Sequence, residues 1–483
     1  MKAPQYGDMP AEDFRKYGHE LVDMMADYFE NIETYPVLAQ VKPGDIKKQI
    51  PDAPPETGED FSEALKDIQR IIMPGVTQWN HPNFHAYFAS TASAPGILAD
   101  LVSSSFNANG MLWKSCPAST ELEGQVVGWL RQMIGLDDKF WGIIYDTASV
   151  STMHAIAAAR ESVAGYKIRE KGLTGSGVPP LRLYTSEHAH SSVEKGTLAL
   201  GMGLEGTRKI KTDNEFKMIP AELENAIQED ITKGFLPFCV VATLGTTSIT
   251  SIDPVEEIAA ICKKYNLWLH IDGAYGGVAS IVPEMRHLIK GCEYADSFVV
   301  NPHKWLFVPF DLSVLYTSKP EALKMAFSLV AEYLKTAEDS SVQNLMDYGV
   351  QLGRRFRSLK LWFVIRYFGR QGLAERLREH MRLAKEFGEW IDSHSVFERM
   401  APVPLSAVCF RAAPSKEMSV EELNTFNEKL MNEINSTGKV FISHTVLNGK
   451  FTLRFVVSGL RTEKKHVDIA KNIFDNVLSK IKY

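Results

Sequence analysis

Apolar residues in the middle of the chain fall into short runs, separated by longer stretches with helical spacing. The runs are rich in β-branched and aromatic residues and end at small or polar ones, which is the pattern of buried strands. Helical stripes lie between them, for example at 151–162 and 192–200. This alternation predicts an α/β fold with a mostly parallel, doubly wound sheet, whose chemistry gathers where the strands end. Strands are expected at 141–145, 181–185, 238–244, 267–272, 297–300 and 311–316.

The first part of the chain has a different pattern. Residues 11–31 and 56–72 carry apolar side chains at helical spacing, and a proline-rich connector at 50–55 joins them. Two amphipathic helices of this kind make a poor core by themselves. We therefore expect residues 1–86 to be a helical dimerisation segment that packs against a second copy of the chain.

A third pattern begins after about residue 366, where helical stripes and strand-like runs alternate again over a shorter length. It predicts a small C-terminal α/β domain at 366–483, which leaves a large α/β domain at 87–365. Neither internal repeats nor low-complexity tracts interrupt the sequence. In the small domain, helices are expected at 375–392, 420–434 and 464–481, and strands at 405–411 and 451–457.

The most informative segment follows the strand expected at 297–300. It reads Asn301-Pro302-His303-Lys304-Trp305, and Pro302 stops ladder pairing, so we expect Lys304 on a loop at the carboxyl end of that strand. Most lysines are solvated surface charges. A lysine between two buried strands is instead partly desolvated, which lowers the pKa of its amine. Such an amine is a nucleophile that can form a Schiff base with a carbonyl group.

An acid lies 32 positions earlier, at the end of the apolar strand 267–272. On its own, Asp272 could cap the strand, bind a metal or bind a ribose. Together with Lys304 it matches pyridoxal 5′-phosphate (PLP), a cofactor that needs a Schiff-base lysine and a carboxylate partner for its protonated ring nitrogen. The pair therefore predicts a PLP-dependent enzyme.

The turn after strand 141–145 suits the phosphate of such a cofactor. Residues 146–149 lead into a helix and would aim backbone amides and the Ser149 hydroxyl at an anion, as helix N-termini do. Simple capping of the helix is the alternative. Residues 201–206 have the glycine spacing of a dinucleotide site, but they follow a helix and do not begin one, so we interpret them as a helix-ending turn.

Aromatic residues gather in an irregular segment at 79–88. We interpret them as the wall of a ligand pocket, with ordinary core packing as the alternative. His81 and His85 have the spacing of a helical metal pair, but Pro82 disfavours that helix, and no metal site is expected. The aromatic side chains of the segment are Trp79, Phe84, Tyr87 and Phe88.

Residues 328–349 are more polar than the stretches around them. A polar loop that carries Tyr333 soon after the cofactor lysine is a candidate lid, and an ordinary surface connection is the alternative. The cations that follow are interpreted as one solvated or interfacial helix face rather than an anion site. They are Arg354, Arg355, Arg357 and Lys360.

Composition narrows the class of protein further. The 483 residues are 45% hydrophobic and 23% charged, as in ordinary soluble proteins, and the formal net charge of -6 argues against nucleic acid or an anionic membrane as the main partner. The N-terminus lacks the pattern of a secretory signal, and no apolar stretch approaches the length of a membrane span. Five dispersed cysteines without a Cys-x-x-Cys pair are typical of reduced thiols, so we expect a cytoplasmic protein.

Seven segments in order along the chain resemble the group II pyridoxal-phosphate-dependent decarboxylases, most closely the aromatic-L-amino-acid decarboxylases. NPHKW is the most specific of them, and the resemblance extends over nearly the whole length. It implies the fold of the PLP-dependent transferases (aspartate aminotransferase-like, fold type I) and a homodimer with active sites at the interface. The segments are HPNFHAYF, CPASTELE, SEHAHSSVEK, TLGTTS, HIDGAYGG, NPHKW and LGRRFRSLKLWFVIRYFG.

The resemblance also implies how the cofactor is held. Lys304 would bind PLP covalently, and Asp272 would pair with its ring nitrogen. His190 would stack on one face of the ring, with Ala274 on the other. The residues around the phosphate would be Ala148, Ser149, Asn301 and His303.

For the substrate, the resemblance implies that Tyr333 donates a proton to the α-carbon and that Thr247 lies near the reacting carboxylate. Some positions differ from the animal enzymes, among them Gly273, which stands in place of an alanine. These differences leave open which aromatic amino acid is preferred. The pocket would be shaped by Trp79, Tyr87, Phe88, Trp305 and Phe310.

The expected activity is therefore decarboxylation of an aromatic L-amino acid to the arylalkylamine and CO2. An oxygen-consuming aromatic acetaldehyde synthase on the same fold is the alternative. In that branch the loop tyrosine is typically phenylalanine or the ring-stacking histidine is replaced, so Tyr333 and His190 oppose it. A catalytically silent scaffold would not need both Lys304 and Asp272. The aromatic wall and Trp305 favour an aromatic substrate over glutamate.

Overall fold

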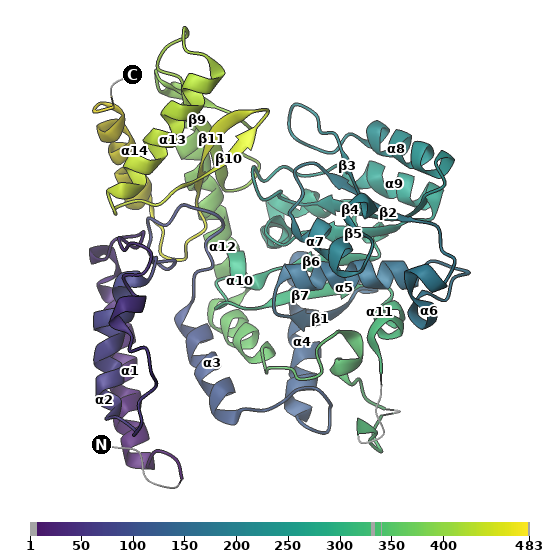
Figure 1. Ribbon diagram of the computed structural model, residues 1–483, viewed down its shortest axis with the longest axis horizontal. Coiled ribbons are helices and arrows are strands. Elements are labelled where there is room, and N and C mark those ends of the chain that lie inside the picture. The colour runs from purple at the N-terminus through teal and green to yellow at the C-terminus, as the bar shows by residue number, and fades with distance from the viewer. Residues whose placement is uncertain (1–6, 330–333, 340, 482–483) are drawn as a thin grey trace.

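The computed structural model describes residues 7–329, 334–339 and 341–481 of the chain. Its centre is a seven-stranded sheet in the order β1-β7-β6-β5-β4-β2-β3 (Figure 1). Within the described residues, β7 alone runs antiparallel to its neighbours, so the predicted mostly parallel sheet is confirmed. The strands are β1 Trp141–Tyr145, β2 Leu181–Ser186, β3 Thr207–Ile210, β4 Leu236–Thr243, β5 Trp268–Asp272, β6 Ser297–Val300 and β7 Ser313–Thr317.

Helices cover both faces of this sheet, because its central strands are apolar on both sides. In β5, Leu269 and Ile271 join the core under α4, α8 and α9, whereas Trp268 joins the core under α5. The helices of this part are α3 Ala94–Phe106, α4 Pro117–Ile134, α5 Ala148–Glu161, α6 Ile168–Gly175, α7 Ser192–Ala199, α8 Pro220–Thr232, α9 Val255–Tyr265, α10 Pro302–Trp305 and α11 Pro320–Phe327.

The predicted strands at 141–145 and 297–300 have the predicted bounds. The prediction that Lys304 lies on a loop is wrong, because residues 302–305 form a single turn of helix, α10. Proline is well suited to the first position of a helix, where its missing N–H would have no partner. Pro302 therefore ends β6 and also begins α10.

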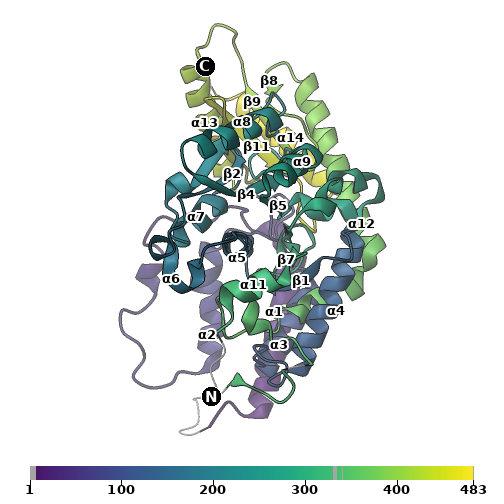
Figure 2. The same cartoon turned by 90° about the vertical axis from the view of Figure 1, so that its right-hand side faces the viewer.

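A second, four-stranded antiparallel sheet follows in the order β10-β11-β9-β8. Its core contains residues of α13 and α14 and of the second half of α12, a long helix that runs past both sheets and is broken at Gly369 (Figure 2). The predicted boundary at residues 365 and 366 falls inside α12, and the division into domains stays a prediction. The elements are α12 Ser358–Ser393, β8 Phe397–Arg399, β9 Ala407–Ala412, α13 Val420–Ser436, β10 Ser443–Leu447, β11 Lys450–Val456 and α14 Lys464–Leu478.

The N-terminal helices α1 (Ala11–Glu30) and α2 (Phe61–Asp67) lie side by side and stand away from the body of the molecule (Figure 1). They meet where the ring of Tyr17 packs at 4.9 Å from that of Phe61. The helix expected at 56–72 is shorter than predicted, and a π turn continues it over 68–72. Large apolar side chains stay exposed on α1, including Phe14 at 61% and Val22 at 52%. None of the helices in the described part of the chain is long and apolar enough to cross a membrane.

The cations at 354–360 do not form one solvated helix face, and this prediction is wrong. Arg354 is buried, and its guanidinium donates to the Glu123 carboxylate at 2.6 Å and to the Ile144 carbonyl at 3.0 Å. The Lys360 side chain is buried 3.3 Å from Asp100. Arg355, in contrast, is exposed and pairs with Asp100 at 3.2 Å. Partners more than 200 residues away decide these positions.

This contrast predicts different stabilities for two neighbouring variants. Arg354→Ala leaves the Glu123 carboxylate buried without its counter-charge, so the free energy of unfolding should fall by about 3 kcal/mol or more. Arg355→Ala removes an exposed pair and should cost less than about 1 kcal/mol. Urea unfolding at one protein concentration measures both. An equal decrease in the free energy of unfolding for both variants would show that the buried Arg354–Glu123 pair stabilises the protein no more than the exposed pair does.

Candidate active site

Three neighbouring chain segments deliver the candidate residues to one edge of the large sheet. Asp272 is the last residue of β5, and its side chain is buried. Asn301 follows β6, and Lys304 lies one turn later in α10. Because β5 and β6 are parallel neighbours, their carboxyl ends lie together. The structure therefore brings the two residues that predicted the cofactor to the same place.

The environment of Lys304 suits a nucleophilic amine. Loss of solvation lowers the pKa of the Lys304 ammonium, and the negative charge of Asp272 opposes that shift. The amine also lies 5.6 Å from the centre of the Phe88 ring. A lowered pKa leaves more of the amine uncharged near neutral pH, which is the form that attacks a carbonyl.

His190 belongs to the same electrostatic group. Burial lowers the pKa of its imidazole, Asp272 raises it and Lys304 lowers it, so the ring is neutral at pH 7. The backbone N–H of Ser192 donates to Nδ1 of His190 at 3.1 Å. Nδ1 is therefore an acceptor, and the proton of the neutral ring lies on Nε2. This tautomer offers a donor N–H rather than a charge.

The predicted phosphate residues come from two segments. Ala148 and Ser149 occupy the first turn of α5, where backbone amides have no acceptor within the helix. The His303 ring is oriented by Leu312, whose N–H donates to Nδ1 at 2.9 Å. Burial lowers the pKa of His303 to about 3, so its ring is neutral. The first-turn amides of α5 and the Nε2–H of the neutral His303 ring are each donors suited to an anion.

Buried polar atoms without partners test whether these residues fit PLP. The side-chain oxygen Oδ1 of Asn301 is buried and has no hydrogen-bond partner in the described structure. Such atoms are rare, and each calls for an explanation. Oδ1 is an acceptor, so a water or another donor bound at this end of the sheet would satisfy it. The buried Lys304 amine, the Asp272 carboxylate and this unpaired amide are groups that fit the cofactor.

Ala274 and Thr247 lie on the backbone that surrounds the site. The Ala274 N–H donates to the Asp272 carboxylate at 3.0 Å, and its carbonyl accepts from the Asn301 N–H at 3.1 Å. Thr247 is held through its carbonyl, which accepts from Nη2 of Arg454 at 2.7 Å. Backbone hydrogen bonds thus fix the positions of Ala274 and Thr247.

Sequence reasoning missed Arg454. It lies on β11, is buried, and donates to the carbonyls of Thr247 and Ser248 and to the Ser443 hydroxyl. No carboxylate pairs with it among the described residues, and its guanidinium carbon lies 5.5 Å from the centre of the Phe88 ring. One signal was available: a charged residue stands between Leu453 and Phe455 in an apolar strand.

The aromatic residues divide into two groups. Phe88 is buried beside Lys304 and stacks on Tyr275 with 3.7 Å between ring centres. Trp305 also stacks on Tyr275, with 4.5 Å between ring centres. It is fully buried, and its indole N–H donates to His380. The structure therefore does not support Trp305 as a substrate contact. Three of the predicted pocket residues stay exposed, namely Trp79 at 40%, Tyr87 at 51% and Phe310 at 65%.

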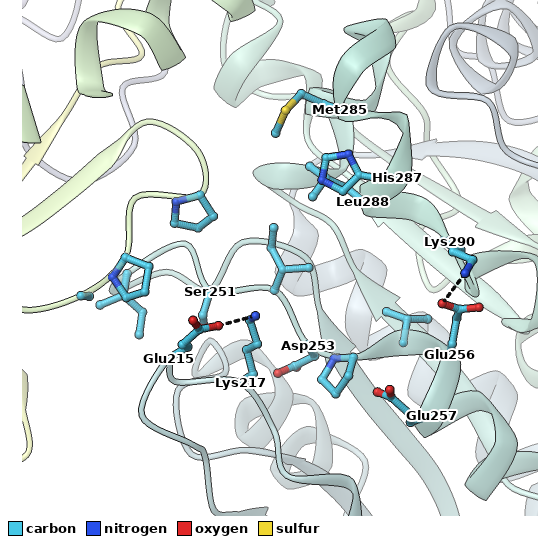
Figure 3. A pocket seen from close by; sticks show the side chains of 17 residues that line it. Glu215, Lys217, Ser251, Asp253, Glu256, Glu257, Met285, His287, Leu288 and Lys290 are labelled. Atoms are coloured by element: carbon cyan, nitrogen blue, oxygen red, sulfur yellow. Dashed lines mark hydrogen bonds and ion pairs between the residues drawn. The ribbon is translucent and has the colours of Figure 1, made fainter. Parts of the chain in front are cut away.

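Neither Tyr333 nor the cleft in Figure 3 belongs to the group of residues described above. Tyr333, the predicted proton donor, lies outside the described residues. The cleft drawn in Figure 3, about 640 Å³ in volume, is lined by residues of 215–217, 249–257, 285–290 and 401–404. None of the described candidate residues lines it, so it is a separate feature of the molecule.

Comparison with known proteins identifies the family. The model of the pyridoxal-dependent decarboxylase conserved domain matches residues 43–413. Tyrosine decarboxylase 2 of Arabidopsis thaliana is 40% identical over 98% of this chain and 88% of its own length. Phenylacetaldehyde synthase of a Rosa hybrid cultivar is 39% identical over 96% and 93%. A crystal structure of the Oryza sativa enzyme named TDC, with PLP and tryptamine, matches 99% of both chains with a TM-score of 0.94 and 35% identity.

The chain belongs to the pyridoxal-dependent decarboxylases, which are PLP-dependent carboxy-lyases. Within that family, it is similar to enzymes named for tyrosine and for tryptophan. The predicted cofactor and the aspartate aminotransferase-like fold are confirmed.

The electrostatics of Lys304 predict which lysine binds PLP. Borohydride reduction of the purified protein should attach the cofactor to Lys304, because this amine is buried and has a lowered pKa. Peptide mapping locates the label. Lys304→Ala should lose the label and keep its circular dichroism spectrum, whereas the exposed Lys195→Ala should keep both. A label on any other lysine would contradict the assignment.

Proposed function

We propose that the protein decarboxylates an aromatic L-amino acid, releasing CO2 and the arylalkylamine. An aromatic substrate is supported mainly by the position of Phe88, whose ring lies beside the Lys304 amine. A substrate bound near that amine meets an aromatic face backed by Tyr275. Aromatic rings in contact add about 0.5–1.5 kcal/mol beyond the area they bury. The relatives named for tyrosine and tryptophan support the same class.

The proposed chemistry assigns one task to each residue around the cofactor. When bound, PLP supplies an electron sink for the pair left on the α-carbon as CO2 departs. Lys304 holds the cofactor, and the Asp272 carboxylate keeps the ring nitrogen protonated by raising its pKa. His190 would cover one face of the bound ring and Ala274 the other, and together they would fix its plane. The pocket then decides which bond of the α-carbon stands perpendicular to that plane.

Arg454 acts on this site as a positioning residue. Its two bonds to the carbonyls of Thr247 and Ser248 hold the segment expected near the reacting carboxylate. A direct ion pair with that carboxylate would stabilise the substrate more than the transition state, in which the charge leaves the carboxylate. The Arg454 guanidinium already donates to two backbone carbonyls, so it can shape the carboxylate pocket without an ion pair to the substrate.

We also propose a homodimer with an active site at each interface. Apolar side chains are exposed on α1 at Phe14 and Val22 and on α3 at Leu98, Leu101 and Phe106. Exposed apolar area of this extent is usual for an interface and unusual for a monomer surface. Phe310, exposed beside His303, would then meet the partner subunit near the phosphate residues.

A cytoplasmic location is proposed from the cysteines. All five are free thiols, and burial raises the pKa of Cys239, Cys262, Cys292 and Cys409. Thiols that are buried and protonated are unreactive, and such thiols persist in a reducing compartment.

An aromatic acetaldehyde synthase is the second candidate, because two of the compared relatives carry that activity in their names. The two reactions divide after CO2 has left. A proton delivered to the α-carbon gives the amine, whereas reaction with oxygen gives the aldehyde, ammonia and peroxide. His190 and Tyr333 are the residues expected of the amine-forming branch.

A substrate panel tests the proposed function. CO2 release, amine, aldehyde and peroxide should be measured with phenylalanine, tyrosine, tryptophan, dihydroxyphenylalanine, histidine and glutamate. We expect CO2 and amine in equal amounts from at least one of the four aromatic substrates with a benzene or indole ring, and none from glutamate. Turnover of glutamate alone would contradict the aromatic pocket. Aldehyde with peroxide as the main products would establish the second candidate.

Tyr333→Phe tests the proposed proton donor. This variant keeps the ring and removes only the hydroxyl, so PLP absorbance and folding should survive. Loss of a general acid typically lowers a rate by about 100-fold or more, and some product should shift to aldehyde and peroxide under air. Tyr348→Phe is the matched control, because Tyr348 is a buried tyrosine in the same polar stretch, 328–349. Amine formation at the parent rate in Tyr333→Phe would remove the phenol from the mechanism.

A further inference from the structure

The cleft in Figure 3 lies where the large sheet meets the link between β8 and β9. Its volume, about 640 Å³, is in the range of small-molecule sites. One wall is the segment 249–257, another is the turn at 285–290, and residues 401–404 close a third side. These residues come from parts of the chain that are far apart in sequence, so the cleft exists only in the folded protein.

The walls of the cleft are largely apolar. Ile249, Val255 and Leu288 are buried core residues that reach its surface, and Ile252 and Met285 pack beside them. Prolines at 254, 402 and 404 add rigid, flat surface. An occupant with an aromatic or other apolar body would bury this surface, which is favourable in proportion to the area covered.

The charges of the cleft are unbalanced. Its two lysines are both compensated, Lys217 by Glu215 at 2.5 Å and Lys290 by Glu256 at 3.1 Å, as the dashed lines in Figure 3 show. Two further carboxylates, Asp253 and Glu257, have no cationic partner in the described part of the chain. Glu257 is exposed at the rim and Asp253 is buried at the base. The cleft therefore attracts a cation and repels an anion.

Asp253 is built into the structure rather than solvated. Its carboxylate accepts the N–H groups of Met218 and Thr243, each at 2.8 Å. Burial raises the pKa of Asp253 to about 6, so the carboxylate is mostly ionised above neutral pH. Its negative charge lies in a poorly solvated place, where it acts more strongly on an approaching cation than a surface charge does.

One wall of the cleft is bonded directly to the active-site segment. Residues 244–252 fold back on themselves, with Leu244 paired to Ile252. Ser251 lines the cleft, and its carbonyl accepts hydrogen bonds from the N–H groups of Gly245 and Thr246. The hydroxyls of Ser251 and Thr246 also form a hydrogen bond, at 2.8 Å. The next residue, Thr247, is the one that Arg454 holds beside the candidate site. A ligand that moves Ser251 must therefore move the Thr246–Thr247 segment.

We propose that this cleft is a second binding site, which takes a small ammonium compound with an aromatic or apolar body and transmits its occupancy to the active site through residues 246–251. The ligand class follows from the lining alone. That the natural occupant is the enzyme's own arylalkylamine, acting as a feedback ligand, rests on the proposed function.

The binding test uses the PLP-loaded, full-length protein and a probe that cannot react with the cofactor. Trimethyl(2-phenylethyl)ammonium has a quaternary nitrogen, so it cannot form an imine. Calorimetric titration should show saturable binding of this cation, weaker binding of 2-phenylethanol and the weakest binding of 3-phenylpropanoate. Added salt should weaken binding of the cation, because screening reduces attraction between exposed charges. Equal binding of the cation and the anion would overturn the proposal.

Variants at Glu257 locate the site. Glu257→Gln removes one exposed charge and should weaken binding of the cation by about two- to fivefold. Glu257→Lys should weaken it further and reduce the preference for the cation over the anion. Glu428→Gln and Glu428→Lys make the same changes at an exposed glutamate on α13, away from the cleft, and should leave binding unchanged. Binding that is insensitive to Glu257 would place the probe elsewhere.

Kinetics test the connection to the active site. Glu257 is outside the catalytic machinery, so its variants should retain basal turnover. The quaternary probe should lower kcat, as a non-competitive inhibitor does, in the parent and in Glu428→Lys, and much less in Glu257→Lys. Purely competitive inhibition that persists in Glu257→Lys would overturn the coupling. The titration needs no turnover, so its result can be interpreted even if the substrate panel disproves the proposed function.

Discussion

The structure depends on one electrostatic arrangement, a buried amine and a buried carboxylate whose charges act on each other where solvent is scarce. Burial lowers the pKa of Lys304, and Asp272 limits that shift. Charges of this kind are costly to bury unless their partners are fixed in place. The parallel pairing of β5 with β6 supplies that fixity, because it brings the end of one strand beside the turn that follows the other. His190, neutral with its proton on Nε2, completes the group without adding a charge.

A stack of three buried aromatic rings packs next to the Lys304 amine. Phe88 lies beside the Lys304 amine, Tyr275 stacks on Phe88, and Trp305 stacks on Tyr275. Trp305 then donates its indole N–H to His380 in α12. Buried aromatic stacks resist rearrangement because close packing leaves no room for other rotamers. The tryptophan next to the cofactor lysine thus acts through the core, and Phe88 is the ring that meets the site.

In the proposed site, the second sheet takes part through Arg454. This guanidinium comes from β11 and holds two carbonyls of the segment that follows β4. The same segment forms a wall of the separate cleft through Ser251 and Asp253. One short piece of chain therefore contacts Arg454 at Thr247 and lines the cleft at Ser251 and Asp253. This shared segment is the physical basis for proposing that binding at one place is felt at the other.

The sequence by itself determined the features that depend on neighbours along the chain. The apolar runs at 141–145 and 297–300 predicted two strands to the residue, and Lys304 with Asp272 predicted the cofactor, since few cofactors need both groups. Tertiary structure alone decided which charges are buried and which aromatic rings meet the site. Arg354 is paired with Glu123, Arg454 with the carbonyl of Thr247, and Trp305 with His380. Those partners lie between 75 and 231 residues away, and local patterns of hydrophobic and polar residues carry no information about contacts over such separations.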